Sequence, residues 1–151
     1  MLQSRFDWHE RIRAIEREYW AVRIAVDELT GKVAHDPMVL GAGPRLRDLT
    51  SADDNLEGTY LIRMFAEFET AVRSYWRTIK PKARPRAEVL LDQLGVRRSA
   101  PADIIRGVHS VREFRNQLVH DRQTPIQPVT IKDARHYLAT YLARLPIQWT
   151  D

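Results

Sequence analysis

The sequence predicts an all-α fold, an up-and-down four-helix-type bundle with one additional short helix. Two observations support this prediction. Apolar residues recur at alternating steps of three and four through most of the chain, which is the spacing of one helix face. The alternation of apolar and polar residues that is typical of β-strands is nearly absent. The chain has 151 residues, a length that fits a single domain over residues 1–151.

The first two predicted helices are long and are separated by a loop. The first apolar stripe covers residues 12–29 and is followed by Gly31, a typical helix stop. A second helix is expected over residues 55–79, and Pro81 ends it. Residues 31–54 contain three glycines and two prolines. We therefore expect a long loop there, of the kind that often carries function.

The remaining helices are expected over residues 85–94, 101–118 and 130–145. Gly95 closes the first of them. Pro101 opens the second, because proline is tolerated in the first turn of a helix. Thr130 opens the last with a spacing similar to a capping box, and Pro146 stops it.

The composition excludes several kinds of site. Cysteine is absent, which excludes a disulfide framework, a thiolate nucleophile and a zinc site with cysteine ligands. The N-terminal residues lack the apolar core of a signal peptide, and no apolar run approaches the length of a membrane span. We therefore expect a cytoplasmic protein without membrane contact. His35 and Asp36 are interpreted as turn residues, so neither a metal nor a cofactor is expected.

The positive charge is concentrated in one segment. The chain carries 24 basic and 20 acidic residues, and only four of the basic residues are lysines. Residues 73–98 hold eight basic and two acidic residues, so this segment is more positive than the whole chain at +4. Such a segment favours RNA as a partner, because phosphate contacts give affinity without sequence readout. A solvated segment without a partner is the alternative.

The predicted RNA-binding residues are Arg73, Arg77, Lys80, Lys82, Arg84 and Arg86, together with Arg112 on the fourth helix. Trp76 lies among the residues of this segment. It is interpreted either as a platform on which a base stacks or as a core residue.

Two charged residues fall within apolar helix faces. At about 100° per residue, Arg115 lies about 20° from Ile104, inside the apolar arc of the fourth helix. Glu69 lies about 80° from Leu61, among the apolar residues of the second helix. Charges in apolar surroundings need a partner or a cleft. We therefore expect Glu69 and Arg115 to face each other, in a pair that either fixes helix register or supports a site.

Residues 111–121 read Val-Arg-Glu-Phe-Arg-Asn-Gln-Leu-Val-His-Asp. This segment resembles the signature of the HEPN superfamily, compact helical bundles of which many members are metal-independent ribonucleases. The signature is an arginine, usually followed by a polar residue, and then a histidine after a short spacer. Arg115, Asn116 and His120 fit it, with four positions between arginine and histidine. Residues 65–73 are similar to the facing helix of such proteins, and the helix count and domain size agree.

The resemblance implies a role for each motif residue. His120 is implied as general base or acid, and Arg115 as the clamp of the phosphate charge. Asn116, one turn before His120, is implied to orient the imidazole or to bind substrate. Arg115 and His120 differ by about 140° on a straight helix. The family typically forms its site at a dimer cleft, which implies a homodimer.

The expected function is therefore a metal-independent RNA endonuclease. A toxin or antiphage effector role, with a cognate antitoxin protein as partner, is implied by the resemblance only. One subgroup of the family, encoded beside a nucleotidyltransferase antitoxin, has a tyrosine two places after the histidine; here that place holds Arg122. The alternatives are a non-catalytic HEPN-like module that binds RNA, nucleotides or protein, and a purely structural four-helix adaptor.

Overall fold

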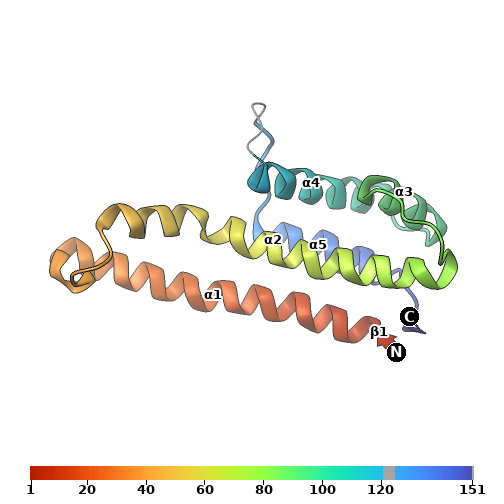
Figure 1. The fold of residues 1–151 in the computed structure, drawn as a ribbon, viewed down its shortest axis with the longest axis horizontal. Coiled ribbons are helices and arrows are strands. Elements are labelled where there is room, and N and C mark those ends of the chain that lie inside the picture. Colours follow the sequence, from red (N-terminus) through yellow and green to blue (C-terminus); the bar gives the residue numbers. More distant parts are fainter. Residues whose placement is uncertain (121–124, 151) are drawn as a thin grey trace.

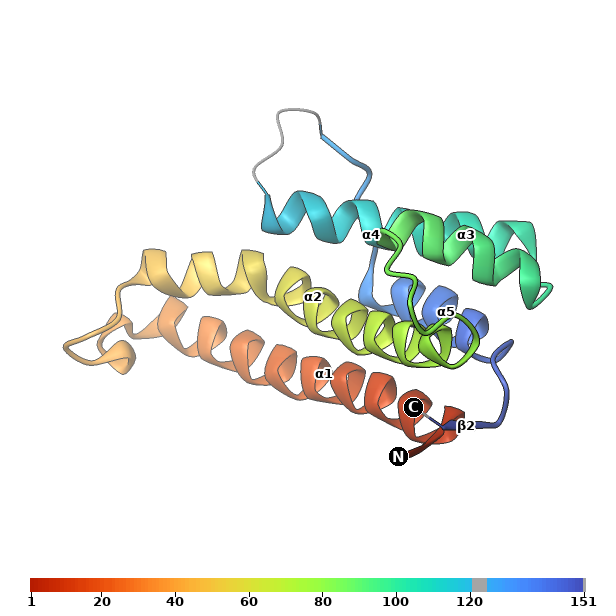
Figure 2. The same ribbon diagram turned by 45° about the vertical axis from the view of Figure 1, so that its right-hand side comes forward.

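The computed structural model describes residues 1–120 and 125–150, and in these residues the all-α class is confirmed. The helices of this part of the chain are α1 (Arg5–His35), α2 (Leu46–Ile79), α3 (Ala87–Arg97), α4 (Ala102–Val119) and α5 (Ile131–Leu142). They lie in three layers, with α1 on one side, α2 and α5 in the middle, and α3 and α4 on the other side (Figures 1 and 2). None of the described helices is long and apolar enough to cross a bilayer.

The core lies between these layers and is built from the predicted stripes. Leu61 and Phe68 of α2, Val108 of α4 and Leu138 of α5 are fully buried. Thr130 caps α5 as predicted, because its Oγ1 accepts a hydrogen bond from the N–H of Asp133 at 3.1 Å. The helix faces that the sequence predicts to be apolar are therefore the ones that meet.

The predicted long loop over residues 31–54 is wrong for most of its length. Helix α1 continues through Gly31 to His35, and α2 begins at Leu46. A methyl group at Gly31 would meet no atom within 4 Å, and one glycine costs a helix only about 1 kcal/mol. The connection shortens to residues 36–45, which include the 3₁₀ helix η1 (Pro37–Leu40).

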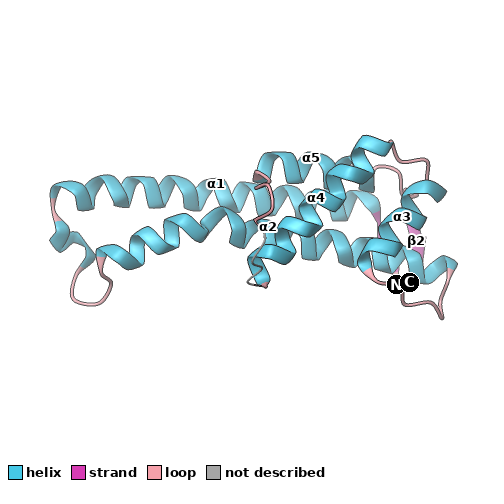
Figure 3. Cartoon of the chain, turned by 90° about the horizontal axis from the view of Figure 1, so that it is seen from above, coloured by secondary structure: helices cyan, strands magenta, loops and turns pink. Residues whose placement is uncertain are grey.

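Because α1 and α2 are longer than predicted, part of the molecule protrudes from the bundle. The second half of α1 and the first half of α2, roughly residues 20–56, extend beyond α4 and α5 as a two-helix hairpin (Figures 1 and 3). We call this hairpin the arm. An ion pair between Arg23 and Asp53 joins its two helices.

Two glycines allow α3, α4 and α5 to approach one another closely. Gly95 lies inside α3 and does not close it as predicted; a methyl group there would lie 2.8 Å from Cδ1 of Ile105. At Gly107 a methyl group would lie 2.2 Å from Cδ1 of Tyr137. Helix α5 ends at Leu142, one turn earlier than predicted.

A small antiparallel sheet, which the sequence did not predict, joins the two ends of the described chain (Figure 3). Strand β1 (Leu2–Ser4) pairs with β2 (Gln148–Thr150). Three residues are too few to show a strand pattern in sequence. Trp149 of β2 is buried, and its Nε1 donates a hydrogen bond to Oγ of Ser74 at 2.9 Å.

Candidate functional site

The C-terminal end of α4 carries Arg115, which is fixed in position and meets no carboxylate of the described residues. The guanidinium of Arg115 lies over the ring of Phe65 in α2, with Cζ 5.7 Å from the ring centroid. Its Nη1 donates a hydrogen bond to Oδ1 of Asn116 at 3.0 Å. Its Nε is buried and has no hydrogen-bond partner in the part of the chain that the structure describes. Among the described residues no carboxylate lies within ion-pair distance of Arg115. Apolar surface and one amide thus hold the cation in position.

His120 stands at the point where the chain leaves α4. It is the C-cap of the helix, with φ −118° and ψ 121°, and its N–H donates a hydrogen bond to the carbonyl of Asn116 at 2.9 Å. Its side chain is exposed and makes no hydrogen bond with the residues that the structure describes. Because His120 is not helical, the 140° separation of a straight helix does not apply. The amide of Asn116 bonds Arg115 and does not orient the imidazole of this chain.

The predicted pairing of Glu69 with Arg115 is wrong. Glu69 instead bonds Arg73, four residues further along α2, with Arg73 Nε 2.8 Å and Nη2 2.7 Å from its Oε1. This spacing lets the pair form within one helix, without ordering a side chain of another helix. Arg73 also donates from Nη1 to the carbonyl of Pro85 at 3.1 Å. The pair therefore holds the α2–α3 connection against α2.

The predicted RNA-binding residues of the α2–α3 region divide into two groups. Arg84 donates to the carbonyl of Pro81 at 2.5 Å, within its own turn, and Lys80 lies over Trp76 with Nζ 5.3 Å from the ring centroid. Lys82 and Arg86, by contrast, are exposed and make no hydrogen bond or ion pair with a described residue.

Arg77 of the same set is exposed near the end of α2. Trp76 itself is buried, with only 4% of its surface exposed. Its indole is therefore a core group, and the platform interpretation of Trp76 is wrong.

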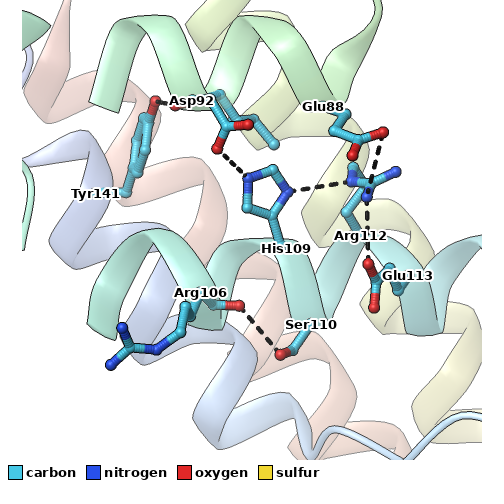
Figure 4. Close-up of polar contacts among 9 residues, drawn as sticks. Glu88, Asp92, Arg106, His109, Ser110, Arg112, Glu113 and Tyr141 are labelled. Atoms are coloured by element: carbon cyan, nitrogen blue, oxygen red, sulfur yellow. Dashed lines mark hydrogen bonds and ion pairs between the residues drawn. The ribbon is translucent and has the colours of Figure 1, made fainter. Parts of the chain in front are cut away.

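A polar network that the sequence did not resolve joins α3 to α4 (Figure 4). Asp92 Oδ1 lies 2.7 Å from Nε2 of His109. Nδ1 of the same ring accepts a hydrogen bond from Nε of Arg112 at 3.4 Å. Arg112 also lies 3.4 Å from Glu113 and 4.0 Å from Glu88. We call these five residues the α3–α4 network.

The α3–α4 network holds α3 and α4 together, and its side chains have few groups left for binding or catalysis. Both ring nitrogens of His109 have hydrogen-bond partners, so neither is left free to bind a substrate. Arg112 is only 15% exposed and already meets two carboxylates, which weakens the case for it as a phosphate ligand. Beneath the network, Tyr141 donates its O–H to the carbonyl of Leu91 at 2.7 Å. Burial, and secondarily the charge of Asp92, raises the pKa of Tyr141.

A hollow of about 400 Å³ lies beside the motif, between α2 and the end of α4. Its apolar lining includes Ile62, Phe114 and Leu118. Two carboxylates, those of Asp54 and Glu57, also line it. One oxygen of Glu57 already has a partner, since its Oε1 accepts a hydrogen bond from the N–H of Ile131 at 2.8 Å. In the described residues no group of three or more histidine, aspartate or glutamate side chains is arranged to hold a metal ion.

In the structure Arg115 bonds Asn116, whereas Glu69 bonds Arg73 and neither of these two residues. His120 is exposed at the end of α4. Arg122, the departure from the tyrosine-bearing subgroup, lies outside the described residues. Comparison of the chain with protein-family models, with curated proteins and with solved structures found no match.

Proposed function

We propose that the chain is a HEPN-like ribonuclease that cleaves RNA without a metal ion, with Arg115, Asn116 and His120 as its site. The observation that carries this proposal is the state of Arg115. Phe65 and Asn116 fix its guanidinium, yet it has no carboxylate partner among the described residues. A buried donor without a partner calls for an explanation, and a pre-positioned cation suits a phosphate whose charge grows during reaction.

His120 supplies the proton transfers in this proposal. The base removes the proton of the 2′-hydroxyl, and the 2′-oxygen attacks the phosphorus. The bond from phosphorus to the 5′-oxygen then breaks, and that oxygen takes up a proton. The products are a 2′,3′-cyclic phosphate and a 5′-hydroxyl end. Histidine suits both proton transfers because its unperturbed titration lies near neutral pH.

We propose further that a second copy of the chain completes the site. Within one chain the ring of His120 makes no hydrogen bond with Arg115 or Asn116. Leu118 and Val119 beside it expose apolar surface, which a second copy would cover. A homodimer at this edge would bring two motifs to one cleft, as the resemblance implies. Lys82 and Arg86 would then contact the RNA backbone outside the cleft.

The toxin or antiphage role, a cognate antitoxin and a cytoplasmic location belong to the same proposal and rest on the resemblance alone. The alternative is a non-catalytic module that binds RNA. The lack of a hydrogen bond between His120 and either Arg115 or Asn116 within one chain favours this alternative.

The experiment that tests the proposal is RNA cleavage in the presence of EDTA. Arg115→Ala and His120→Ala are each expected to lower the cleavage rate by at least about a hundredfold, the usual cost of losing one transition-state donor or a proton-transfer group. Arg106→Ala and His136→Ala are matched controls, since both side chains are exposed, on α4 and α5, and neither belongs to the motif. Equal cleavage by all four folded variants contradicts catalysis by the motif. RNA binding without cleavage by the wild type supports the alternative.

A further inference from the structure

The outer face of α1 carries a run of cations that the bundle leaves at the surface. Arg5, His9, Arg13 and Arg17 follow one another at intervals of four residues. This interval keeps side chains on one strip of a helix surface. Arg13 and Arg17 are exposed, on the side away from the buried positions of α1. Helix α1 forms the layer opposite α3 and α4 (Figures 1 and 2), so this strip is remote from the motif.

Arg5, His9 and Arg13 share a hollow of about 640 Å³ at the start of α1. Arg5 is anchored there, because its Nη1 donates to the carbonyls of Ala143 at 2.8 Å and Leu145 at 2.9 Å. Burial, followed by the charges of Arg5 and Arg13, lowers the pKa of His9. The two arginines therefore act on one small volume, where an anion would be attracted.

Two acidic residues at the hollow oppose its two arginines, and Arg17 adds a third positive charge beside them. Asp7 and Glu10 also line it. Glu10 is bonded to Arg17, with Oε1 2.5 Å from Nη2. Counted together, Arg5, Arg13 and Arg17 exceed Asp7 and Glu10 by one positive charge, and this excess increases when His9 is protonated.

Exposed aromatic rings accompany the cations. Phe6 is 61% exposed and Trp20 is 48% exposed. Of the aromatic side chains in the described residues, these two alone are classed as exposed. At about 100° per residue both lie within about 20° of Arg13 around the helix. They are about 21 Å apart along the axis at 1.5 Å per residue. Both rings thus lie among the cations, and Arg5 covers one face of Phe6, with its Cζ 5.5 Å from the ring centroid.

We propose that this strip of α1, made of Arg5, Phe6, His9, Arg13, Arg17 and Trp20, binds single-stranded nucleic acid. Phosphates occupy the hollow between the arginines, and bases stack on the two exposed rings. The interleaving of cations with aromatic rings favours this ligand over a lipid surface, which selects a continuous apolar face. The proposal does not depend on cleavage, because the strip and the motif lie on opposite layers.

The test is binding of a short fluorescently labelled RNA, and of DNA of the same sequence, measured by anisotropy. His120→Ala serves as the background so that the RNA stays intact. Phe6→Ala and Trp20→Ala are each expected to weaken binding about five- to a hundredfold. Arg13→Gln is expected to reduce the slope of log affinity against log salt by about 0.7. Thermal unfolding confirms that each variant is folded, which is expected because the three side chains are exposed.

Matched controls come from exposed surface outside this strip of α1. Arg106→Gln removes an equal charge from exposed α4 surface, and Met38→Ala removes exposed apolar surface from the arm. Neither is expected to change affinity more than twofold. The imidazole of His9 gives a second readout by NMR, since phosphate bound between Arg5 and Arg13 raises its pKa. Inorganic phosphate alone is expected to produce part of this rise.

Three results would overturn the proposal. The first is unchanged affinity in Phe6→Ala, Trp20→Ala and Arg13→Gln together. The second is binding to anionic vesicles that the same substitutions abolish while nucleic-acid binding persists. The third is a dimer that Trp20→Ala converts to monomer without any effect on nucleic-acid affinity. Loss of binding in Lys82→Glu with no effect of the α1 substitutions would instead move the docking surface to the α2–α3 connection.

Discussion

Arg112 and Arg115 lie three residues apart on α4, yet their surroundings differ. Arg112 meets His109, Glu88 and Glu113, so its charge is balanced within the α3–α4 network. Arg115 meets the ring of Phe65 and the amide of Asn116, and no carboxylate of the described residues balances it. A balanced cation joins helices, whereas a fixed and unbalanced one is available to an external anion. The difference separates the structural half of α4 from its candidate functional end.

In the structural half of α4, a substitution at Gly107 is expected to have the largest effect on stability. Gly107→Ala is expected to lower the free energy of unfolding by about 1–3 kcal/mol, because the added methyl group overlaps the ring of Tyr137 and that ring is packed against α4. Gly31→Ala is the matched control. A methyl group meets nothing there, so this variant is expected to gain about 0.5–1 kcal/mol. Urea unfolding measures both, and equal values would contradict the close approach of α4 and α5.

The comparison of the two arginines is sharpened by their effects on stability. Arg112→Gln is expected to cost about 1 kcal/mol, because it leaves the carboxylates and His109 without their shared donor. Arg115→Gln is expected to change the free energy of unfolding by less than about 0.5 kcal/mol, since it breaks no ion pair. Chemical denaturation of both variants measures this difference. The reverse order would mean that Arg115 has a structural partner.

A further prediction concerns the phenol beneath the network. Tyr141→Phe is expected to cost about 1 kcal/mol near neutral pH, through loss of the hydrogen bond to Leu91. The raised pKa of Tyr141 means that, above about pH 10, the unfolded chain loses the phenolic proton before the folded chain does. Wild-type stability should therefore decline as pH rises beyond that point, while the decline is smaller in Tyr141→Phe. A constant difference between the two proteins from pH 8 to pH 11 would contradict the burial of this hydroxyl.

The sequence predicts the packing of this protein better than the pairing of its charges. The stripes that contain Leu61 and Val108 are buried as expected, because the periodicity of a helix fixes which face is apolar. The partner of Glu69 was mispredicted, because a helical wheel gives directions but not distances between helices. Arg73, on the same helix, is always within reach of Glu69.

The remaining errors have other physical causes. Gly31 was read as a stop, although a single glycine is a weak signal in a helix of 31 residues. Residues 148–150 form a strand that is too short to show a pattern in the sequence. The burial of Trp149 and its hydrogen bond to Ser74 could therefore not be predicted. In the candidate site, the sequence located Arg115 on the inner side of α4. It could not indicate that Asn116 bonds this arginine instead of the imidazole of His120.

The arm has a consequence for how the molecule loses structure. Of its residues only Val33 is buried, and its two helices extend beyond α4 and α5 (Figure 3), so little buried surface opposes their local opening. Residues 61–76 of α2, by contrast, lie in the centre of the core and separate from it only when the whole bundle unfolds. A single continuous helix thus contains a segment that opens locally and a segment that opens globally. Amide hydrogens along α2 should therefore form a gradient of exchange rates, fastest near Leu46 and slowest beyond Leu61.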